Sequence, residues 1–584
     1  MSQFFKFLFA SCLGTILAVG FIFFLLFAVG ASMSTIDTSV SSNSVLLLEF
    51  DGTIPEHTSN VEQDKFDFSG DKAIGVHRIK KLIKHAQNDK NIKGIVYKPS
   101  FASQAGMATN SILRKAIKEF KDSTDKFVYS YADYYTNPTY LIASASDSIF
   151  INPNGMLELN GYGAMIPFFK EGLEKLGVEM NVFYAGNFKS ATEPYRRNDM
   201  SESNRLQTRE YLTDNFNLYL DEVSESRNLD RSKILEIINT FNLNNITDGL
   251  ENNLLDASLH WFEFEDILRE KLNIKEGKKV GYIELGEYDS KTVIRRGTSK
   301  NKIALIYAEG EIIYGSNDKG IVSEEKYHKL FDKIRSDDNF KAVVLRVNSP
   351  GGSAFTSDVI WREMKALQAQ GIPVVASYGD YAASGGYYIS AGADRIIANP
   401  RTLTGSIGVF SMLPNASRLL DEKLGIHFDT VKTSPYANAI TPFFDLGKDE
   451  KQALQNYTDE MYAKFLGIVA EGREKTVDEI HEVAQGRVWT GARALQLGLV
   501  DELGDLDDAL EVAAQMAELE DYKVYEYPTI KKEIWEEFLE GFMAGQAKVK
   551  LTPAEKELYT QFKDLRAVLR YREPIARMQY TVIH

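Results

Sequence analysis

Residues 131–153 read YADYYTNPTYLIASASDSIFINP, and residues 378–400 read YGDYAASGGYYISAGADRIIANP. Nine of these 23 positions carry the same residue without a gap, at an offset of 378 − 131 = 247. Two further pairs of segments fall near this offset, 91–100 with 339–348 at 248 and 45–54 with 303–312 at 258. An offset that stays nearly constant over about 200 residues indicates an internal duplication.

Each copy alternates short β-rich runs with helical patterns. AVVLRVN at 342–348, PVVASYG at 373–379 and RIIANP at 395–400 predict buried strands. A helix is predicted between the first two of these runs, over 353–370, and a longer amphipathic helix over 450–474. This βαβ rhythm predicts an α/β fold with a mostly parallel sheet in each copy.

A chain of 584 residues is too long for one core and predicts two or more domains. The predicted divisions are a membrane anchor and linker at 1–43, a degenerate first repeat at 44–275, a second repeat with the chemistry at 300–525, and a helical tail at 526–584. We interpret the charged tail helix over 531–572 as a packing or interaction arm.

An uncharged apolar run of 24 residues extends from Phe7 to Gly30. As a helix it is long enough to cross about 30 Å of hydrocarbon, and it exceeds the roughly 7–15 residues of a signal-peptide core. We therefore expect an uncleaved anchor, with cleavage near Ala31 as the alternative. Lys6 precedes the run and the next lysine or arginine is Lys65, so the rest of the chain is predicted to lie outside the cytoplasm.

Composition excludes several classes of protein. The net charge of −15, from 82 acidic and 67 basic residues, argues against a nucleic-acid-binding protein. The single cysteine, Cys12, excludes an internal disulfide and zinc sites built on cysteine pairs, and we interpret it as a small residue of the apolar run. The eight histidines form no HExxH or HxH pattern, so no metal is predicted.

Two glycine-rich loops follow predicted strands of the second copy. RVNSPGGSAFTSD at 346–358 is a tight turn before a helix, whose bare backbone N–H groups suit a developing oxyanion. GDYAASGGYYIS at 379–390 places Ser384 between small residues at a turn into a helix, where the Gly385 N–H would be a second oxyanion donor. A lone turn of this kind is weak evidence, since a plain strand-to-helix turn has the same pattern.

The comparison of the copies strengthens the case for Ser384. Asn137 stands at its position in the first copy (384 − 137 = 247), and the Pro-Gly-Gly loop is also missing there. The first copy instead contains GNFKSATEP at 186–194, in which Lys189 stands opposite Ala437 of the second copy (437 − 189 = 248). One copy has the hydroxyl and the other a lysine, so we predict two half-sites that complete each other across an internal interface.

A serine hydroxyl needs a base, and lysine serves only when its pKa falls from about 10.4 towards neutrality. Burial between the two copies would supply that shift for Lys189. Ser406, in LTGSIG at 403–408, is a candidate to orient the neutral amine, with a plain turn serine as the alternative.

Histidine is the rival base. His427 lies in the apolar run GIHFDTV at 425–431, which predicts a strand, so we expect a packed side chain there rather than a base. His328 and His481 lie in charged helical contexts and are predicted to be exposed.

The segments GNFKSATEP, RVNSPGG, DYAASGGYYIS, NPRTLTGSIG and GRVWTGARALQLGLVDELG resemble the long form of bacterial signal peptide peptidase A. That family belongs to the crotonase and Clp-protease structural group. The resemblance implies tandem duplicated crotonase/Clp-protease-like domains behind one N-terminal transmembrane helix. It also implies site roles, namely Ser384 as nucleophile, Lys189 as base, Ser406 as helper, and Gly351 or Gly352 with Gly385 as the oxyanion hole.

By the same resemblance the protein is expected to be a serine endopeptidase that degrades signal-peptide remnants and other apolar peptides without a cofactor. It is expected to form a homo-oligomer, a tetramer, on the extracytoplasmic side of a bacterial inner membrane, with lipid contact through residues 7–30. Two alternatives from other classes are a crotonase-type acyl-CoA enzyme and a non-catalytic membrane scaffold.

Overall fold

The computed structural model describes residues 40–50, 52–58, 73–100, 105–243, 245–275, 277–292, 298–316, 320–529, 575–578 and 582–583, together with Gly14. The predicted anchor at 7–30, with Cys12, and the predicted tail helix at 531–572 lie outside these ranges. Among the helices within them, none combines the length and the apolar character needed to cross a membrane.

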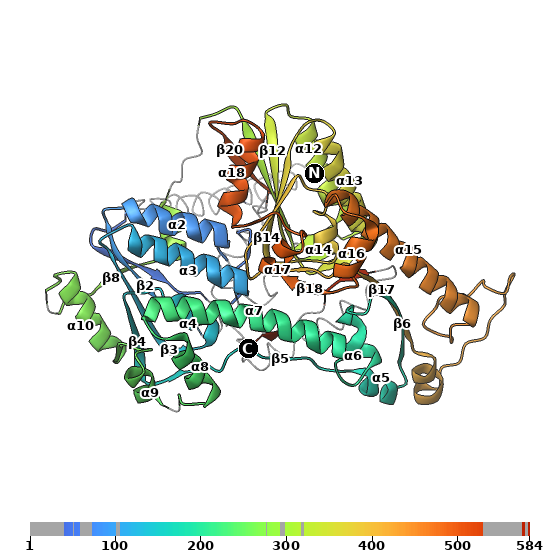
Figure 1. Cartoon of the computed structure of the whole chain (residues 1–584), viewed down its shortest axis with the longest axis horizontal. Helices are drawn as coiled ribbons and strands as arrows, with labels where there is room; N and C mark the ends of the chain where they lie inside the picture. The colour runs from blue at the N-terminus through green and yellow to red at the C-terminus, as the bar shows by residue number, and fades with distance from the viewer. Residues whose placement is uncertain are drawn as a thin grey trace, which may run out of the picture.

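The first copy forms a parallel sheet in the order β7-β4-β3-β2-β1-β8, the left lobe of Figure 1. Its strands are β1 (Ser44–Leu48), β2 (Ile92–Tyr97), β3 (Phe127–Tyr135), β4 (Ser148–Leu157), β7 (Ala257–Ser258) and β8 (Gly281–Glu284). Helices α2 (Val76–Asn88) and α3 (Met107–Asp122) pack on one face, and α10 (Trp261–Lys271) packs on the other.

The second copy forms a sheet in the order β18-β16-β14-β12-β9-β20, with β15 beside β14 and β19 beside β15. Its pairs are parallel except for β16 with β18. The strands are β9 (Lys302–Glu309), β12 (Phe340–Ser349), β14 (Val374–Ala383), β15 (Arg395–Ala398), β16 (Leu403–Gly405), β18 (Val488–Thr490), β19 (Glu502–Leu503) and β20 (Lys523–Tyr527). The three strands and two helices predicted for this copy are confirmed, the helices being α13 (Ala354–Gln368) and α15 (Lys448–Gly472).

Strand β9 shows why the second sheet is buried on both faces. Its side chains alternate, so Ile303 and Leu305 enter one hydrophobic core, whereas Ala304 and Ile306 enter the other. Helix α18 (Leu506–Met516) contributes to the first core and α13 to the second. A parallel strand covered by helices on both faces therefore reads as a continuous apolar run rather than as an alternating one.

A third, mixed sheet joins the two copies in the order β11-β10-β13-β21-β17-β6. Its strands are β6 (Glu179–Ala185), β10 (Glu311–Ile312), β11 (Ile321–Val322), β13 (Gly351–Ser353), β17 (Val409–Asn415) and β21 (Ile575–Arg577). Strand β6 comes from the first copy and pairs antiparallel with β17 of the second along its whole length. This pairing places the residues that follow β6 against the second copy.

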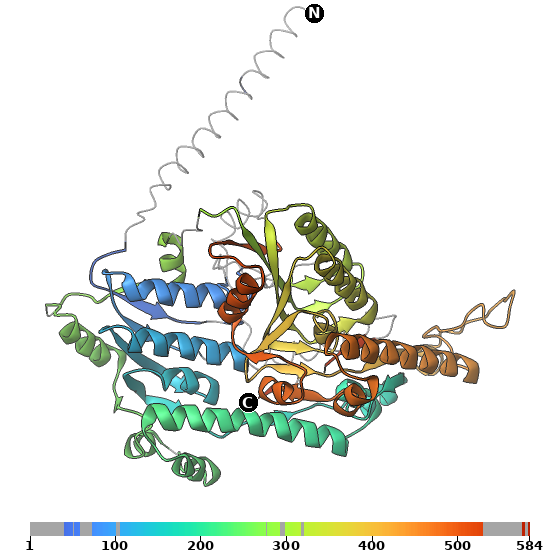
Figure 2. The same ribbon diagram turned by 45° about the horizontal axis from the view of Figure 1, so that its top comes forward.

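A long helix, α7 (Glu202–Arg227), runs below both lobes in Figures 1 and 2. Its Asp214 pairs with Arg493 of the second copy, while its Tyr219 is buried in the core of the first.

The remaining elements are α4 (Asn137–Ala143), β5 (Ala164–Met165), α5 (Lys170–Leu176), η1 (Ser190–Thr192), α6 (Glu193–Arg196), α8 (Arg231–Asn239), α9 (Ile246–Glu251), α11 (Leu285–Lys291), α12 (Glu324–Arg335), α14 (Gly385–Tyr388), η2 (Leu419–Lys423), α16 (Val477–Val483), α17 (Gly491–Gln496) and β22 (Val582–Ile583).

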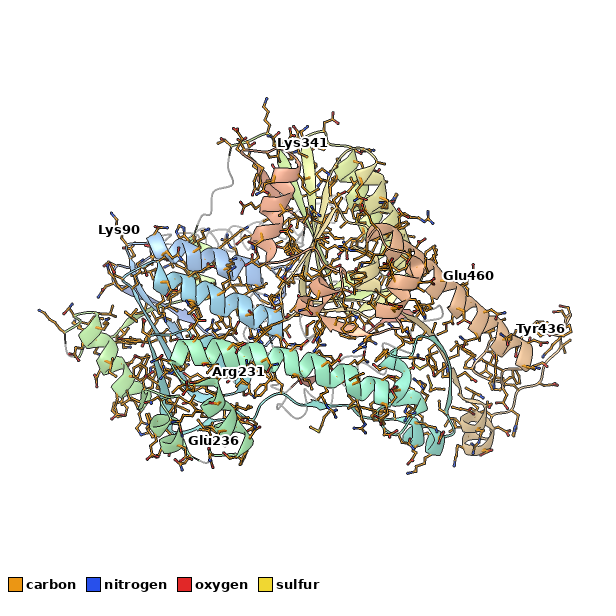
Figure 3. The ribbon with its side chains drawn as sticks, viewed as in Figure 1. Lys90, Arg231, Glu236, Lys341, Tyr436 and Glu460 are labelled. Carbon is orange, nitrogen blue, oxygen red and sulfur yellow. The ribbon has the colours of Figure 1, made fainter. Side chains whose placement is uncertain are left out.

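The prediction of a strand at 425–431 is wrong. These residues form no helix or strand and are exposed. They belong to an arm that projects from the body of the molecule, marked in Figure 3 by Tyr436 and by Glu460 on α15. The apolar run had predicted a strand, but no neighbouring strand pairs with this segment in the described part of the chain.

Candidate active site

Lys189 lies in a turn that crosses from the first copy to the second. β6 ends at Ala185, and Gly186 then adopts φ +101°, which favours glycine. A Cβ on Gly186 would lie 2.4 Å from the carbonyl of Gln485, so only glycine fits this approach. The Phe188 N–H donates to the Gln485 carbonyl at 2.8 Å and fixes the turn against the second copy.

Ser384 lies between the end of β14 and the start of α14. Its backbone has φ 56° and ψ −115°, outside the regions that serine ordinarily adopts, and its N–H donates to the Gly405 carbonyl at 2.8 Å. A strained serine at a strand-to-helix turn is a pattern of nucleophilic sites, where the surrounding structure holds the hydroxyl in place. Ser406 also has a positive φ, of 49°.

The structure brings Lys189, Ser384 and Ser406 together, as the sequence predicted. Lys189 Nζ lies 2.8 Å from Ser384 Oγ, 3.1 Å from Ser406 Oγ and 3.1 Å from the Ser406 carbonyl oxygen. These three oxygens match a neutral amine, which can donate to two of them and accept the Ser384 proton with its lone pair.

The site is closed to solvent. Ser384 is 0% exposed and Lys189 is 2% exposed. Burial lowers the pKa of the Lys189 amine well below its usual value, because the charged form loses its hydration. In the described part of the chain no carboxylate pairs with this amine to restore the charge, so the uncharged form is favoured.

The two glycine loops pack against each other beside Ser384. A Cβ on Gly386 would lie 2.6 Å from the Ser349 carbonyl oxygen, and one on Gly352 would lie 2.0 Å from that of Ile312. Gly385 is the first residue of α14, where an N–H has no partner within the helix. Gly351 donates its N–H to Ser349 Oγ at 3.2 Å, and strand β13, which contains both loop glycines, is paired on its two sides.

The counterparts of the dyad in the other copy carry no comparable site. Asn137 begins α4 as Ser384 precedes α14, but its amide donates to the Gly161 carbonyl at 2.9 Å. Ala437, opposite Lys189, is exposed on the projecting arm. The arrangement is therefore one composite site, with the amine from the first copy and the hydroxyl from the second.

The histidines lie elsewhere. His427 was expected to be a packed side chain but is exposed and contacts Asp421 on the arm, so that expectation is wrong. His328 and His481 are exposed on α12 and α16, as predicted. No cluster of three or more histidine, cysteine or acidic residues able to hold a metal occurs among the residues that the structure describes.

Two features of the site were missed from the sequence. Gln207 of α7 contacts both neighbours of Lys189, through the Phe188 carbonyl at 3.1 Å and Ser190 Oγ at 3.0 Å. The second is β21, a strand near the end of the chain that pairs with β13. Both features depend on contacts between different elements of the fold, so the local pattern gave no signal for them.

This chain is similar to several known proteins. The model of peptidase family S49 matches residues 119–275 and 366–520, one segment in each copy. Protease 4 of Haemophilus influenzae is 35% identical over 82% of this chain and 80% of its own, and Protease 4 of Salmonella typhi is 34% identical over 88% and 86%. A putative signal peptide peptidase SppA of Enterococcus faecium is 37% identical over 40% of this chain and 69% of its own. The solved structure of ClpP1 from Listeria monocytogenes is 17% identical over 35% of this chain and 94% of its own, with a TM-score of 0.23.

Proposed function

Since this chain belongs to peptidase family S49 and is a serine peptidase, we propose that Ser384 and Lys189 are its catalytic dyad. The observation that carries the proposal is the 2.8 Å contact between Lys189 Nζ and Ser384 Oγ inside a buried site. Family membership favours this function over the acyl-CoA enzyme and the membrane scaffold, since neither of those needs a buried serine–lysine pair.

The proposed reaction is acyl transfer to Ser384 followed by hydrolysis. The Lys189 amine takes the Ser384 proton as Oγ attacks the peptide carbonyl, and N–H groups of Gly385 and of Gly351 or Gly352 stabilise the oxyanion. The protonated amine then gives its proton to the leaving nitrogen, and the neutral amine activates water for deacylation. Ser406 acts as helper, because its hydroxyl and carbonyl oxygens hold the amine at 3.1 Å each.

The dyad is tested by substitution with two readouts. Lys189→Ala and Ser384→Ala should each lower hydrolysis of an apolar peptide by at least about 1,000-fold, and both should lose labelling by a fluorophosphonate. Lys175→Ala, an exposed lysine on α5, is the matched control and should retain both activities. Full activity in Lys189→Ala would show that this amine is not the base.

The proposed substrates are apolar peptides, including signal-peptide remnants. Support comes from the relative named as a putative signal peptide peptidase and from the apolar residues around the site, among them Ala383 and Leu403. A panel of peptides that differ only in the residue before the cut tests this, and equal cleavage after charged and apolar residues would contradict it.

We place the peptidase on the extracytoplasmic side of a bacterial inner membrane, anchored through residues 7–30. The support is the uncharged run from Phe7 to Gly30, with its only nearby basic residue, Lys6, before it. Protease added outside spheroplasts should digest the folded domains. Protection of those domains would contradict the proposed orientation.

We also propose that the chain, with its Clp-protease-like repeats, forms a homo-oligomer, namely a tetramer. The projecting arm exposes a cluster of apolar side chains that a monomer would leave in water, namely Leu424, Ile426, Phe428, Val431, Tyr436, Ile440 and Phe443. Light scattering on the detergent-solubilised protein should give four chains, and Val431→Glu should reduce that number. A monomeric wild-type protein would contradict the proposal.

A further inference from the structure

A cavity of about 400 Å³ lies against helix α7 on the first copy. Its wall is formed by the segment from Asn160 to Ala164, by α7 from Arg205 to Phe216 and by the end of α8, in the lower part of Figure 1. We call it the α7 cavity. A volume of this size suits a small ligand or the last few residues of a peptide.

Two arginines make the rim of the α7 cavity positive. Arg205 and Arg209 lie four residues apart on α7, both are exposed, and neither forms an ion pair in the described part of the chain. Among the described residues that line the cavity, none is acidic. The molecule as a whole has a net charge of −15, so the rim differs from it in sign. Because a guanidinium binds a carboxylate through two parallel hydrogen bonds, the rim fits an anionic group of that kind.

Apolar side chains line the same cavity. The rings of Phe216 and Tyr162 meet edge to face with their centroids 5.9 Å apart, and both pack on the core of the first copy. Leu212 and Ile238 add aliphatic surface. A ligand that satisfies both the rim and this lining has an anionic end and an apolar body.

The internal duplication relates the α7 cavity to the catalytic site. Gly161 stands where Gly408 stands in the second copy (408 − 161 = 247). The Asn137 amide donates to the Gly161 carbonyl at 2.9 Å, and Ser384 Oγ, at the same position of the other copy, donates to the Gly408 carbonyl at 3.4 Å. The segment that contacts the proposed nucleophile in the second copy therefore lines a cavity in the first. Since the second copy is the one that acts on peptides, this equivalence favours a peptide as the ligand.

Helix α7 separates the cavity from the dyad by its own thickness. Gln207 faces the catalytic site, whereas Arg205 and Arg209, two residues before and after it, lie on the opposite face of the helix. Leu212 lines the cavity and also packs with the cluster that contains Ala383, beside the nucleophile. A helix is about 10–12 Å across, so an extended peptide held at the dyad would reach the cavity with about four residues of about 3.3 Å each.

We propose that the α7 cavity binds the free C-terminal carboxylate of an apolar peptide, as an exosite for the substrate that the dyad cleaves. The proposal rests on the proposed function of the dyad. Arg205 and Arg209 hold the carboxylate, and the apolar lining takes the last side chains of the peptide. Such a carboxylate exists only at a chain end, as an earlier endoproteolytic cut creates, so the exosite favours released peptides over internal segments of proteins.

The first test compares one apolar peptide as free acid and as C-terminal amide, with at least four residues after the cut. The wild-type chain should hydrolyse the free acid with a KM about tenfold lower and kcat nearly unchanged, because a remote contact kept in the transition state changes only KM. Arg205→Gln combined with Arg209→Gln should remove this difference. Equal KM values for the two peptides in the wild type would overturn the proposal.

The matched control removes two exposed basic residues elsewhere. Lys341→Gln with Arg395→Gln changes the net charge by the same amount and should keep the preference for the free acid. Figure 3 labels Lys341 at the end of the molecule opposite Glu236 of α8. A charge reversal, Arg205→Glu with Arg209→Glu, should favour a peptide that ends in an aminoethylamide. Retained preference for the free acid after that reversal would contradict the assignment.

Binding to Ser384→Ala separates this proposal from that of the dyad. An N-terminally labelled peptide should bind this variant about tenfold more tightly as the free acid than as the amide, measured by fluorescence anisotropy. If the variant binds both equally and hydrolyses neither, the dyad stands and the exosite is wrong. If it hydrolyses both, the dyad is wrong, whereas a tenfold preference in binding still supports the carboxylate site.

The same binding measurement distinguishes a peptide from a lipid anion, which also has an anionic end and an apolar body. Unlabelled free-acid peptide should displace the labelled peptide at a concentration at least about tenfold below that of decanoate. Displacement by decanoate at the lower concentration would assign the cavity to a lipid anion and overturn the proposal.

Discussion

At the scale of single residues, the proposed chemistry depends on the charge of one amine. Lys189 Nζ is surrounded by Ser384 Oγ and two oxygens of Ser406, all uncharged. A protonated lysine in this position would keep its charge without a carboxylate and almost without water. The structure therefore favours the neutral amine, the form that the proposed base needs in order to act at ordinary pH.

The pH dependence follows from this shift. Burial holds the pKa of Lys189 well below the ordinary 10.5, and only the form without the extra proton can accept one from Ser384. Activity should therefore be low below that lowered pKa and rise as pH increases through it, with a plateau well before 10.5. The kcat/KM profile for a peptide substrate measures this, and a midpoint near 10.5 would contradict the assigned role.

The sequence predicted this pair of residues because the duplication supplied an internal comparison. Neither Ser384 nor Lys189 is distinctive alone, but each is replaced at the equivalent position of the other copy, by Asn137 and Ala437. The strained backbone of Ser384 and the contact of the Ser406 carbonyl with the amine were not predictable, since both arise from packing around the turns.

At the scale of elements, α7 supports the site from outside it. The Gln207 amide donates to the Phe188 carbonyl and to Ser190 Oγ, and its oxygen accepts from the Val488 N–H at 3.1 Å. Val488 belongs to β18, which pairs with β16 just before Ser406. One buried side chain therefore holds the turn that carries the proposed base, Lys189, and the strand that leads to the proposed helper, Ser406.

Gln207 is accordingly expected to be a positioning residue. Gln207→Leu should lower kcat by about 10- to 100-fold with KM nearly unchanged, because a displaced Lys189 impairs proton transfer and leaves binding intact. Fluorophosphonate labelling should slow in parallel, and Gln207→Glu should also be slow, since a carboxylate can accept from Val488 but cannot donate to the Phe188 carbonyl. Gln452→Leu, an exposed glutamine on α15, is the control. A change confined to KM or to thermal stability would contradict the role.

Elements that rest on local pattern were predictable, and those that rest on distant pairing were not. Strands β12, β14 and β15 are continuous apolar runs and were expected. By contrast, β21 is three residues long and exists because β13 and β17 leave room between them. The strand predicted at 425–431 fails for the opposite reason. The segment has an apolar pattern but no strand to pair with in the described chain, and strand preference depends on what a segment packs against.

At the scale of the whole molecule, the two copies hold each other through buried polar contacts. The Asp380 carboxylate accepts from the Thr109 N–H at 2.9 Å and from its hydroxyl at 2.6 Å, and so caps α3 of the first copy from strand β14 of the second. A Cβ on Gly106, which precedes α3, would lie 2.1 Å from the Asp380 carboxyl carbon. The duplication predicted an interface of this kind but not its residues, because local pattern does not indicate which polar groups will meet.

A second buried contact between the copies is the ion pair of Glu56 with Arg346, in which both side chains are 1% exposed and two N–O distances are 2.9 Å. Arg346 lies on β12, which ends at the loop of the proposed oxyanion hole, so this pair connects the packing of the copies to the site. Removal of one partner would leave the other buried and uncompensated, a situation that costs about 3–5 kcal/mol. Replacement of both by apolar residues avoids that cost.

Glu56→Gln should therefore lower the free energy of unfolding by about 3–5 kcal/mol, measured by chemical denaturation, and reduce peptidase activity as the copies separate. Glu56→Leu combined with Arg346→Met should recover most of the stability. Glu422→Gln, which removes an exposed pair with Arg418, is the matched control and should change stability by less than about 1 kcal/mol. Equal losses from the buried and exposed variants would mean that the contact between the copies does not depend on this pair, and the two halves of the dyad would then be held together by β6 and α7.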